Sequence, residues 1–214
     1  MNDIVSKIFK EIYMLRLIIG LIVCLSVTEF AFAAGDADRG KTLTAVCAAC
    51  HGADGNSAAG TFPSLAGQGA KYLVKQMKDI KSGARPVVLM TGQLNNVSEQ
   101  DMADIAAYFE SQAIKMGTAK QDLVAEGEQI FRWGIQRKGI AACSACHSPT
   151  GSGIAAAAFP AVAGQWPEYV TAQLKAFRVN ERTNDGESRM MQDTAMDLSD
   201  REIDAVASYI YGLH

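Results

Sequence analysis

The pentapeptide Cys-x-x-Cys-His occurs twice in this chain, at residues 47–51 and 143–147. Two thiols at this spacing, followed directly by a histidine, form the attachment site of c-type haem, in which the histidine ligates the iron. Redox disulfides and zinc sites also use Cys-x-x-Cys, but neither needs a histidine after each pair. The sequence therefore predicts two haem c groups. Their predicted attachment points are Cys47, Cys50, Cys143 and Cys146, and their histidine ligands are His51 and His147.

The surroundings of the motif are repeated too, so the sequence predicts a tandem duplication of one domain. Residues 62–68 match residues 159–165 at an offset of 97. Tyr72, Gln76 and Arg85 recur at the same offset as Tyr169, Gln173 and Arg182. We expect an N-terminal domain over residues 34–118 and a C-terminal domain over residues 119–214.

Helical periodicity predicts three helices in each half, around a long loop rich in glycine and alanine. The first helix is expected over 37–48 with Asp36 as its cap, and Asp122 is expected to cap its counterpart. The second helix begins near Tyr72 in one half and Tyr169 in the other. Residues 132–140 have no counterpart and are expected to be an insertion.

The third helix of each half has the clearest start signal. Ser98 and Ser199 are good N-cap residues, and Ser199 with Glu202 forms a capping box. No segment alternates as a strand does. The predicted fold is therefore all-α, with two tandem cytochrome c-type domains, each wrapped around a covalently bound haem.

The first 33 residues are predicted to be a secretory signal peptide. An uncharged stretch of eleven residues, 17–27, follows Arg16 and precedes Ala31-Phe32-Ala33. The stretch is too short for the hydrocarbon core, which needs about 20 residues. We expect cleavage near Ala33 and export to the periplasm, with an uncleaved membrane anchor as the alternative. Met14 is an alternative start.

The charge pattern excludes a nucleic-acid partner. Residues 34–118 hold eight Lys/Arg and eight Asp/Glu, and residues 119–214 hold nine and twelve. Neither half carries the basic patch that binding to nucleic acid requires.

The distal iron ligands are expected to be methionines. Apart from the two motif histidines the chain has only His214, whereas two bis-histidine haems would need four. A thioether is the natural replacement. Only Met90 and Met191 are methionine in both repeats, and each precedes the last helix by a segment expected to be a loop. Met190 remains an alternative to Met191.

Pro63 and Pro160 follow the two ligand histidines by 12 and 13 residues. A proline carbonyl can accept the Nδ1–H of the ligand histidine and fix its ring. An ordinary turn proline is the alternative interpretation.

The sequence resembles the di-haem cytochrome c4 family along nearly the whole of residues 34–214. The resemblance lies in the run from Cys47 to Asn56, the doubled Phe-Pro loop, Met90-Thr91-Gly92, residues 182–186 and the closing Tyr211-Gly212-Leu213-His214. It implies two class I cytochrome c domains about a pseudo-two-fold axis, His/Met ligation, and electron delivery to terminal oxidases in the periplasm. The family usually has leucine where Val97 stands.

The expected function is that of an electron carrier, not an enzyme. Its expected partners are an upstream quinol-oxidising complex or dehydrogenase and a downstream terminal oxidase, with loose membrane association as a further option. A fixed subunit of a larger respiratory or dehydrogenase complex and a di-haem peroxidase are the alternatives. The halves are expected to pack face to face so that electrons pass between them. The matched tyrosines and arginines of the repeat would then contact either haem propionates or the other half, with an ordinary place on the helix surface as the alternative.

Overall fold

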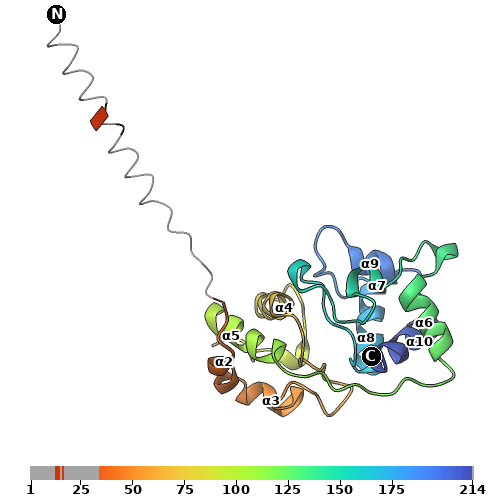
Figure 1. Cartoon of the computed structure of the whole chain (residues 1–214), viewed down its shortest axis with the longest axis horizontal. Helices are drawn as coiled ribbons and strands as arrows, with labels where there is room; N and C mark the ends of the chain where they lie inside the picture. The colour runs from red at the N-terminus through yellow and green to blue at the C-terminus, as the bar shows by residue number, and fades with distance from the viewer. Residues whose placement is uncertain (1–12, 15, 17–33, 214) are drawn as a thin grey trace, which may run out of the picture. The chain divides into compact units, whose positions relative to one another are not determined.

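The computed structural model describes Tyr13, Met14, Arg16 and residues 34–213. The predicted signal peptide and its cleavage site therefore lie almost wholly outside the described residues. Within the described residues, every helix is too short or too polar to cross a membrane. Ala34–His214 form one unit, coloured orange to blue in Figure 1.

Helices form nearly all the regular structure of this unit, which agrees with the all-α prediction. The elements of the N-terminal half are α2 (Ala37–Leu43), α3 (Ala45–His51), α4 (Ala70–Ser82), η1 (Val88–Met90) and α5 (Glu99–Glu110). Those of the C-terminal half are α6 (Val124–Trp133), η2 (Gln136–Lys138), α7 (Ser144–His147), η3 (Ala155–Ala157), α8 (Pro167–Arg178), α9 (Met190–Ala195) and α10 (Asp200–Tyr211). In residues 34–213, strand-like pairing is confined to isolated bridges, Ile135 with Ile140 and Ile154 with Phe159.

The first predicted helix, 37–48, is two helices in the structure. Asp36 caps α2 as expected, because its side chain accepts hydrogen bonds from the backbone N–H groups of Asp38 and Arg39. The helix ends at Thr44, whose hydroxyl donates to the carbonyl of Lys41 at 2.9 Å. Such local side-chain bonding competes with the helical ladder. The chain then turns into α3, which carries the first haem motif.

The expected cap of the corresponding C-terminal helix is wrong by one residue. Helix α6 has Leu123 at its N-cap position, with no side-chain capping bond, so Asp122 lies outside the helix. The predicted starts of the last helices are confirmed. Ser98 and Ser199 both form complete capping boxes, with Asp101 and Glu202 respectively.

A pair of packed terminal helices forms the frame of each half, α2 against α5 and α6 against α10 (Figure 1). A glycine stands at each crossing. A methyl group on Gly40 would lie 2.0 Å from the carbonyl oxygen of Asp104, and one on Gly127 would lie 2.3 Å from that of Ala205. Only hydrogen fits at either point, so both halves depend on glycine for the same close approach.

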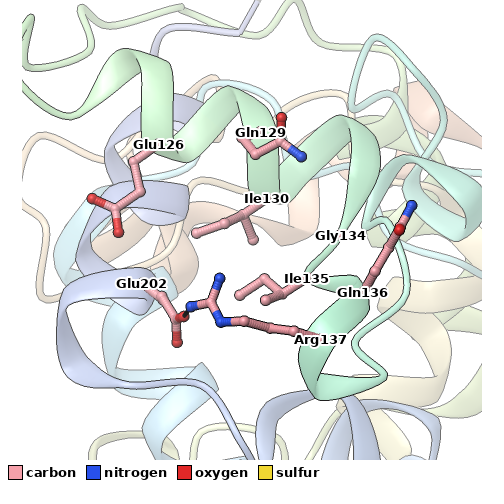
Figure 2. A pocket seen from close by; sticks show the side chains of 8 residues that line it. All are labelled: Glu126, Gln129, Ile130, Gly134, Ile135, Gln136, Arg137 and Glu202. Carbon is pink, nitrogen blue, oxygen red and sulfur yellow. Dashed lines mark hydrogen bonds and ion pairs between the residues drawn. The ribbon is translucent and has the colours of Figure 1, made fainter.

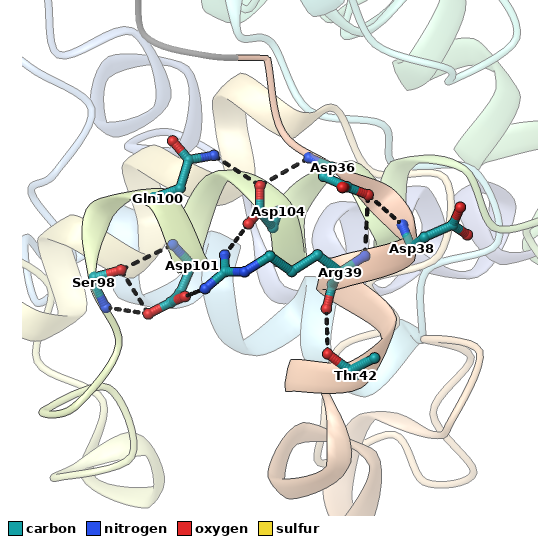
Figure 3. Close-up of polar contacts among 8 residues, drawn as sticks. All are labelled: Asp36, Asp38, Arg39, Thr42, Ser98, Gln100, Asp101 and Asp104. Atoms are coloured by element: carbon teal, nitrogen blue, oxygen red, sulfur yellow. Dashed lines mark hydrogen bonds and ion pairs between the residues drawn. The ribbon is translucent and has the colours of Figure 1, made fainter.

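Different polar contacts lock the two crossings. In the N-terminal half, Arg39 of α2 reaches both Asp101 and Asp104 of α5 (Figure 3). In the C-terminal half, Arg201 of α10 pairs with Glu126 of α6 at 2.8 Å, and Arg137 and Lys138 bind Glu202 at the start of α10. Arg137 and Lys138 belong to the predicted insertion, which begins within α6 and curls back over α6 and α10. The insertion borders a hollow of roughly 400 Å³. Figure 2 shows the side chains that line it.

Candidate haem sites

Helix α3 places the first motif within one short segment of the N-terminal half. Cys47 is half-buried, Cys50 is exposed, and His51 at the helix end is buried. In the C-terminal half the motif spans the shorter α7, with Cys143 just before it and Cys146 and His147 inside it. The four motif thiols are all unpaired, so no disulfide occupies either site.

The surroundings of Cys47 and Cys143 do not suit a thiolate site. Burial raises the pKa of Cys47, and burial raises the pKa of Cys143 to about 11. Zinc ligands and redox-active cysteines need the opposite shift, because the thiolate is the reactive form. No group of three His, Cys, Asp or Glu side chains in the described part of the chain is placed to hold a metal ion.

Both motif histidines are held by proline carbonyls. Nδ1 of His51 lies 2.8 Å from the carbonyl oxygen of Pro63, and Nδ1 of His147 lies 2.9 Å from that of Pro160. Since a carbonyl only accepts, Nδ1 must carry the proton, which leaves the lone pair of Nε2 free for a metal. Burial lowers the pKa of both rings, which keeps them neutral. The predicted contact of each proline with its histidine is confirmed.

The methionines occupy different surroundings. Met90 ends η1 and Met191 is the second residue of α9, and both are half-buried. Met190 is 44 % exposed, whereas Met102 is 2 % exposed and belongs to the core. The expectation of a loop is wrong for Met191, because a helical turn carries it. Met90 and Met191 remain the candidates for the distal position.

Asp185 anchors the segment of Met191, a role that the sequence analysis missed. Its Oδ2 accepts the backbone N–H groups of Met191 at 2.9 Å and Gln192 at 3.0 Å. Its Oδ1 accepts the side-chain amide of Gln192 at 2.5 Å. Three bonds to one carboxylate explain why α9 forms here. An aspartate shortly before a helix was the available signal.

The matched arginines and tyrosines of the repeat reach across to the opposite half. Arg85 donates to the hydroxyl of Tyr169 at 2.9 Å, and Arg182 donates to that of Tyr72 at 3.2 Å. Each arginine thus contacts the tyrosine of the opposite half, and the repeat exchanges the two contacts, as two-fold symmetry demands. Of the roles left open for these residues, the structure shows the contact between the halves.

The two guanidinium groups are buried together, and their hydrogen-bond acceptors are neutral side chains. Arg85 and Arg182 are 8 % and 9 % exposed, and both donate to the side-chain oxygens of Gln76 and Gln173. Asp79 bonds to Asn184 and attracts the charge of Arg85, so among the described residues a single carboxylate faces two buried guanidinium groups. Buried charges require compensation, so the interface fits two groups that bring carboxylates. A haem c in each half supplies them, and the unpaired thiols and free Nε2 atoms complete the fit.

A second reciprocal contact joins the two loops that contain Pro63 and Pro160, residues 62–68 and 159–165, which we call the proline loops. The side-chain amide of Gln165 accepts from the backbone N–H of Ser64 and donates to its carbonyl, both at 2.9 Å. The side-chain amide of Gln68 makes the same pair of bonds with Ala161, also at 2.9 Å. Both glutamines lie in the proline loops, but their place in the sequence alone predicts no role for them. Their occurrence in both repeats was the signal.

Comparison with known proteins agrees with this arrangement. The Cytochrome c family model matches residues 37–113 and again 124–214. Cytochrome c4 of Pseudomonas aeruginosa is 55 % identical over 199 residues, which cover 93 % of this chain and 99 % of the relative. The crystal structure of reduced recombinant cytochrome c4 from Pseudomonas stutzeri has a TM-score of 0.83 and 48 % identity, covering 85 % of this chain and 100 % of that one.

A further relative carries a different name. The thiosulfate dehydrogenase electron acceptor of Stutzerimonas stutzeri is 40 % identical over 168 residues, which cover 76 % of each chain.

Proposed function

Since this chain belongs to the cytochrome c4 family of di-haem cytochromes, we propose that it is a periplasmic electron carrier that delivers electrons toward a terminal cytochrome c oxidase. Its cofactors are two haem c groups, one in each half. When bound, each supplies a one-electron Fe(III)/Fe(II) couple. The observation that carries the proposal is the doubled unit of motif histidine and proline carbonyl.

The chain's residues divide the work of holding the two groups. Cys47 with Cys50, and Cys143 with Cys146, form the thioether bonds. His51 and His147 provide the proximal ligands through Nε2, because their Nδ1 atoms are committed to carbonyl oxygens. Met90 and Met191 provide the distal ligands, and a thioether there favours the reduced iron and raises the potential. With a histidine and a methionine assigned to each haem, the two sites would transfer electrons without binding a substrate.

Arg85 and Arg182 neutralise the carboxylates of the two groups at the contact between the halves. Their burial and their shared neutral acceptors support this role. The same packing holds the halves against each other, so that an electron entering one half can leave from the other. A pulse-reduction experiment tests this, because centres that are re-oxidised independently of each other would contradict it.

The ligand set is tested with four leucine variants of similar volume. We expect Met90→Leu and Met191→Leu each to lower the potential of one centre, within the ~0.8 V range that axial ligands control. Each should also let that centre bind carbon monoxide. Met77→Leu and Met190→Leu are the controls and should do neither. If Met190→Leu let a centre bind carbon monoxide, the distal ligand of the C-terminal half would be Met190 and not Met191.

Attachment is tested by mass. The secreted protein should carry two haems that survive denaturation and acid extraction. A single haem, or haem that is extracted, would contradict the thioether assignment.

A second function is favoured by one relative, the thiosulfate dehydrogenase electron acceptor. In this alternative the chain serves one dehydrogenase as a dedicated acceptor and does not diffuse among several partners. Purification from the native source under mild conditions distinguishes the two. A stoichiometric dehydrogenase partner supports the alternative, whereas a lone cytochrome that a terminal oxidase re-oxidises rapidly supports the carrier.

A further inference from the structure

Each proline loop is held from the other half of the molecule. The backbone of Ser64, next to Pro63, receives two hydrogen bonds from the side chain of Gln165. The backbone of Ala161, next to Pro160, receives two from Gln68. All four bonds are 2.9 Å long.

These bonds end one residue away from the carbonyls that orient the histidines. Pro63 holds His51 at 2.8 Å, and Pro160 holds His147 at 2.9 Å. The carbonyl of a proline and the backbone N–H of the following residue belong to one planar peptide unit, so a displacement of that N–H also turns the proline carbonyl. The amide of Gln165 is therefore connected to the ring of His51 through the peptide unit between Pro63 and Ser64 and the hydrogen bond from His51 to the Pro63 carbonyl.

The glutamine amides are themselves well fixed. Gln68 and Gln165 are 7 % and 8 % exposed, and the oxygen of each also accepts the backbone N–H of the next residue at 3.1 Å. A buried amide with both ends bonded has one orientation, because a flip would place donor against donor. Such a group can hold a loop in place.

We propose that Gln165 positions the iron ligand His51, and Gln68 the iron ligand His147, so that each half orients the proximal histidine of the other. The inference rests on the proposed function in one respect, namely that these histidines ligate iron. A hydrogen bond from Nδ1–H to a carbonyl makes Nε2 more basic and stabilises Fe(III). Loosening that bond from across the interface therefore raises the potential of the distant centre.

The test uses Gln165→Met and Gln68→Met in the holoprotein, because methionine keeps the length and loses the bonds. NMR observes the two histidine rings separately during a redox titration. In Gln165→Met we expect exchange of the His51 Nδ1–H to become about fivefold to tenfold faster, as for one lost hydrogen bond, and the N-terminal centre to become easier to reduce. Gln68→Met should affect His147 and the C-terminal centre.

Two controls separate positioning from general loosening. Gln112→Met removes a glutamine that bonds only within its own half. Lys71→Met removes a bond across the interface, to the carbonyl of Ala156, that does not touch a proline loop. Neither should move a histidine resonance or a potential.

The crossed pattern decides the inference. If each glutamine variant changes its own half first, or if Lys71→Met has the same effect, the inference is overturned. A separate variant tests the ligand assignment itself. If His51 does not ligate iron, His51→Ala will have the same iron spectrum as the wild type. That result would contradict the proposed function, whereas the glutamine variants test only the positioning.

Discussion

The N-terminal half joins its terminal helices through a buried acid, whereas the C-terminal half joins them through the surface pair of Glu126 and Arg201 and adds an inserted loop. Asp104 is 1 % exposed and holds Arg39, Gln100 and the backbone of Asp36 (Figure 3). At the matching position of the C-terminal half stands Ala205, which has no acid to offer, and the cations there are Arg201 and residues 137 and 138 of the inserted loop. The glycine at the crossing is the same in both. Close backbone packing has thus been kept, while the polar contacts around it have been exchanged.

The methionine segments diverge in the same way. Met90 follows Arg85 by five residues and is held by a single turn, in which its N–H donates to the carbonyl of Val87 at 2.9 Å. Met191 follows Arg182 by nine, and the extra residues include Asp185, which anchors it. The proline–histidine contact, by contrast, differs by only 0.1 Å between the halves, 2.8 Å against 2.9 Å. What lies closest to the proposed iron ligand is conserved between the halves, and what supports it is not.

The largest expected effect tests the shared feature. Gly40→Ala and Gly127→Ala would each force a methyl group against a backbone carbonyl, which cannot move aside as a side chain can. We expect each to lower the free energy of unfolding by about 3 kcal/mol or more, as measured by denaturant unfolding. Gly69→Ala is the control, since its nearest neighbour is 3.8 Å away. Unequal losses would show that the two crossings are not equivalent.

Asp104→Ala should sharpen the difference between the halves. It leaves the backbone N–H of Asp36 and the guanidinium of Arg39 without their acceptor, at a cost of about 2–3 kcal/mol. Hydrogen exchange should show the loss in α2 and α5 and not in α6 and α10. Protection that falls equally in both halves would contradict a lock confined to one of them.

Asp185→Ala should weaken the anchor of Met191 by about 1 kcal/mol, the usual value of a lost helix cap. Carbon monoxide should then compete more readily at one centre while the other stays as in the wild type. Asp193→Ala removes an acid from α9 that does not contact Met191, and it serves as the control. Asp185→Asn keeps an acceptor and should restore most of the resistance to carbon monoxide.

The smallest expected effect concerns the stability of the protein at acidic pH. Hydrogen bonds from Ser98, then from Arg39, lower the pKa of Asp101 to about 2. Because this lies below the unfolded value, its contribution to stability is complete above about pH 4 and is lost as the pH falls through about 2. Asp101→Asn should flatten the pH dependence of unfolding in that window. An unchanged acid limb would show that the contact is not maintained in solution.

Local patterns in the sequence predicted much of this molecule. The repeat gives the two halves, Ser98 and Ser199 give the starts of the last helices, and Pro63 and Pro160 identify the partners of the histidines. In each case the signal and its partner lie within a few residues, or are marked by a doubled motif.

Other features depend on contacts that a single segment does not contain. The hydroxyl of Thr44 competes with a helix that propensity alone would continue. The six residues of α9 depend on Asp185, which lies five residues before the helix begins. Gly40 has meaning only against the carbonyl of a residue 64 positions away. The partners of Gln68 and Gln165 lie in the opposite half, and the periodicity of hydrophobic residues does not predict contacts between the halves.

The exchange of glutamines between the halves also bears on how such a chain evolves. After duplication, a second copy of a domain is usually free to drift while the first is kept under selection. Here the side chain at position 68 acts on the backbone of Ala161, and the one at position 165 acts on that of Ser64. A harmful substitution in either copy is therefore felt in the other. Selection on one repeat therefore acts on the other as well, and the two repeats are expected to evolve together.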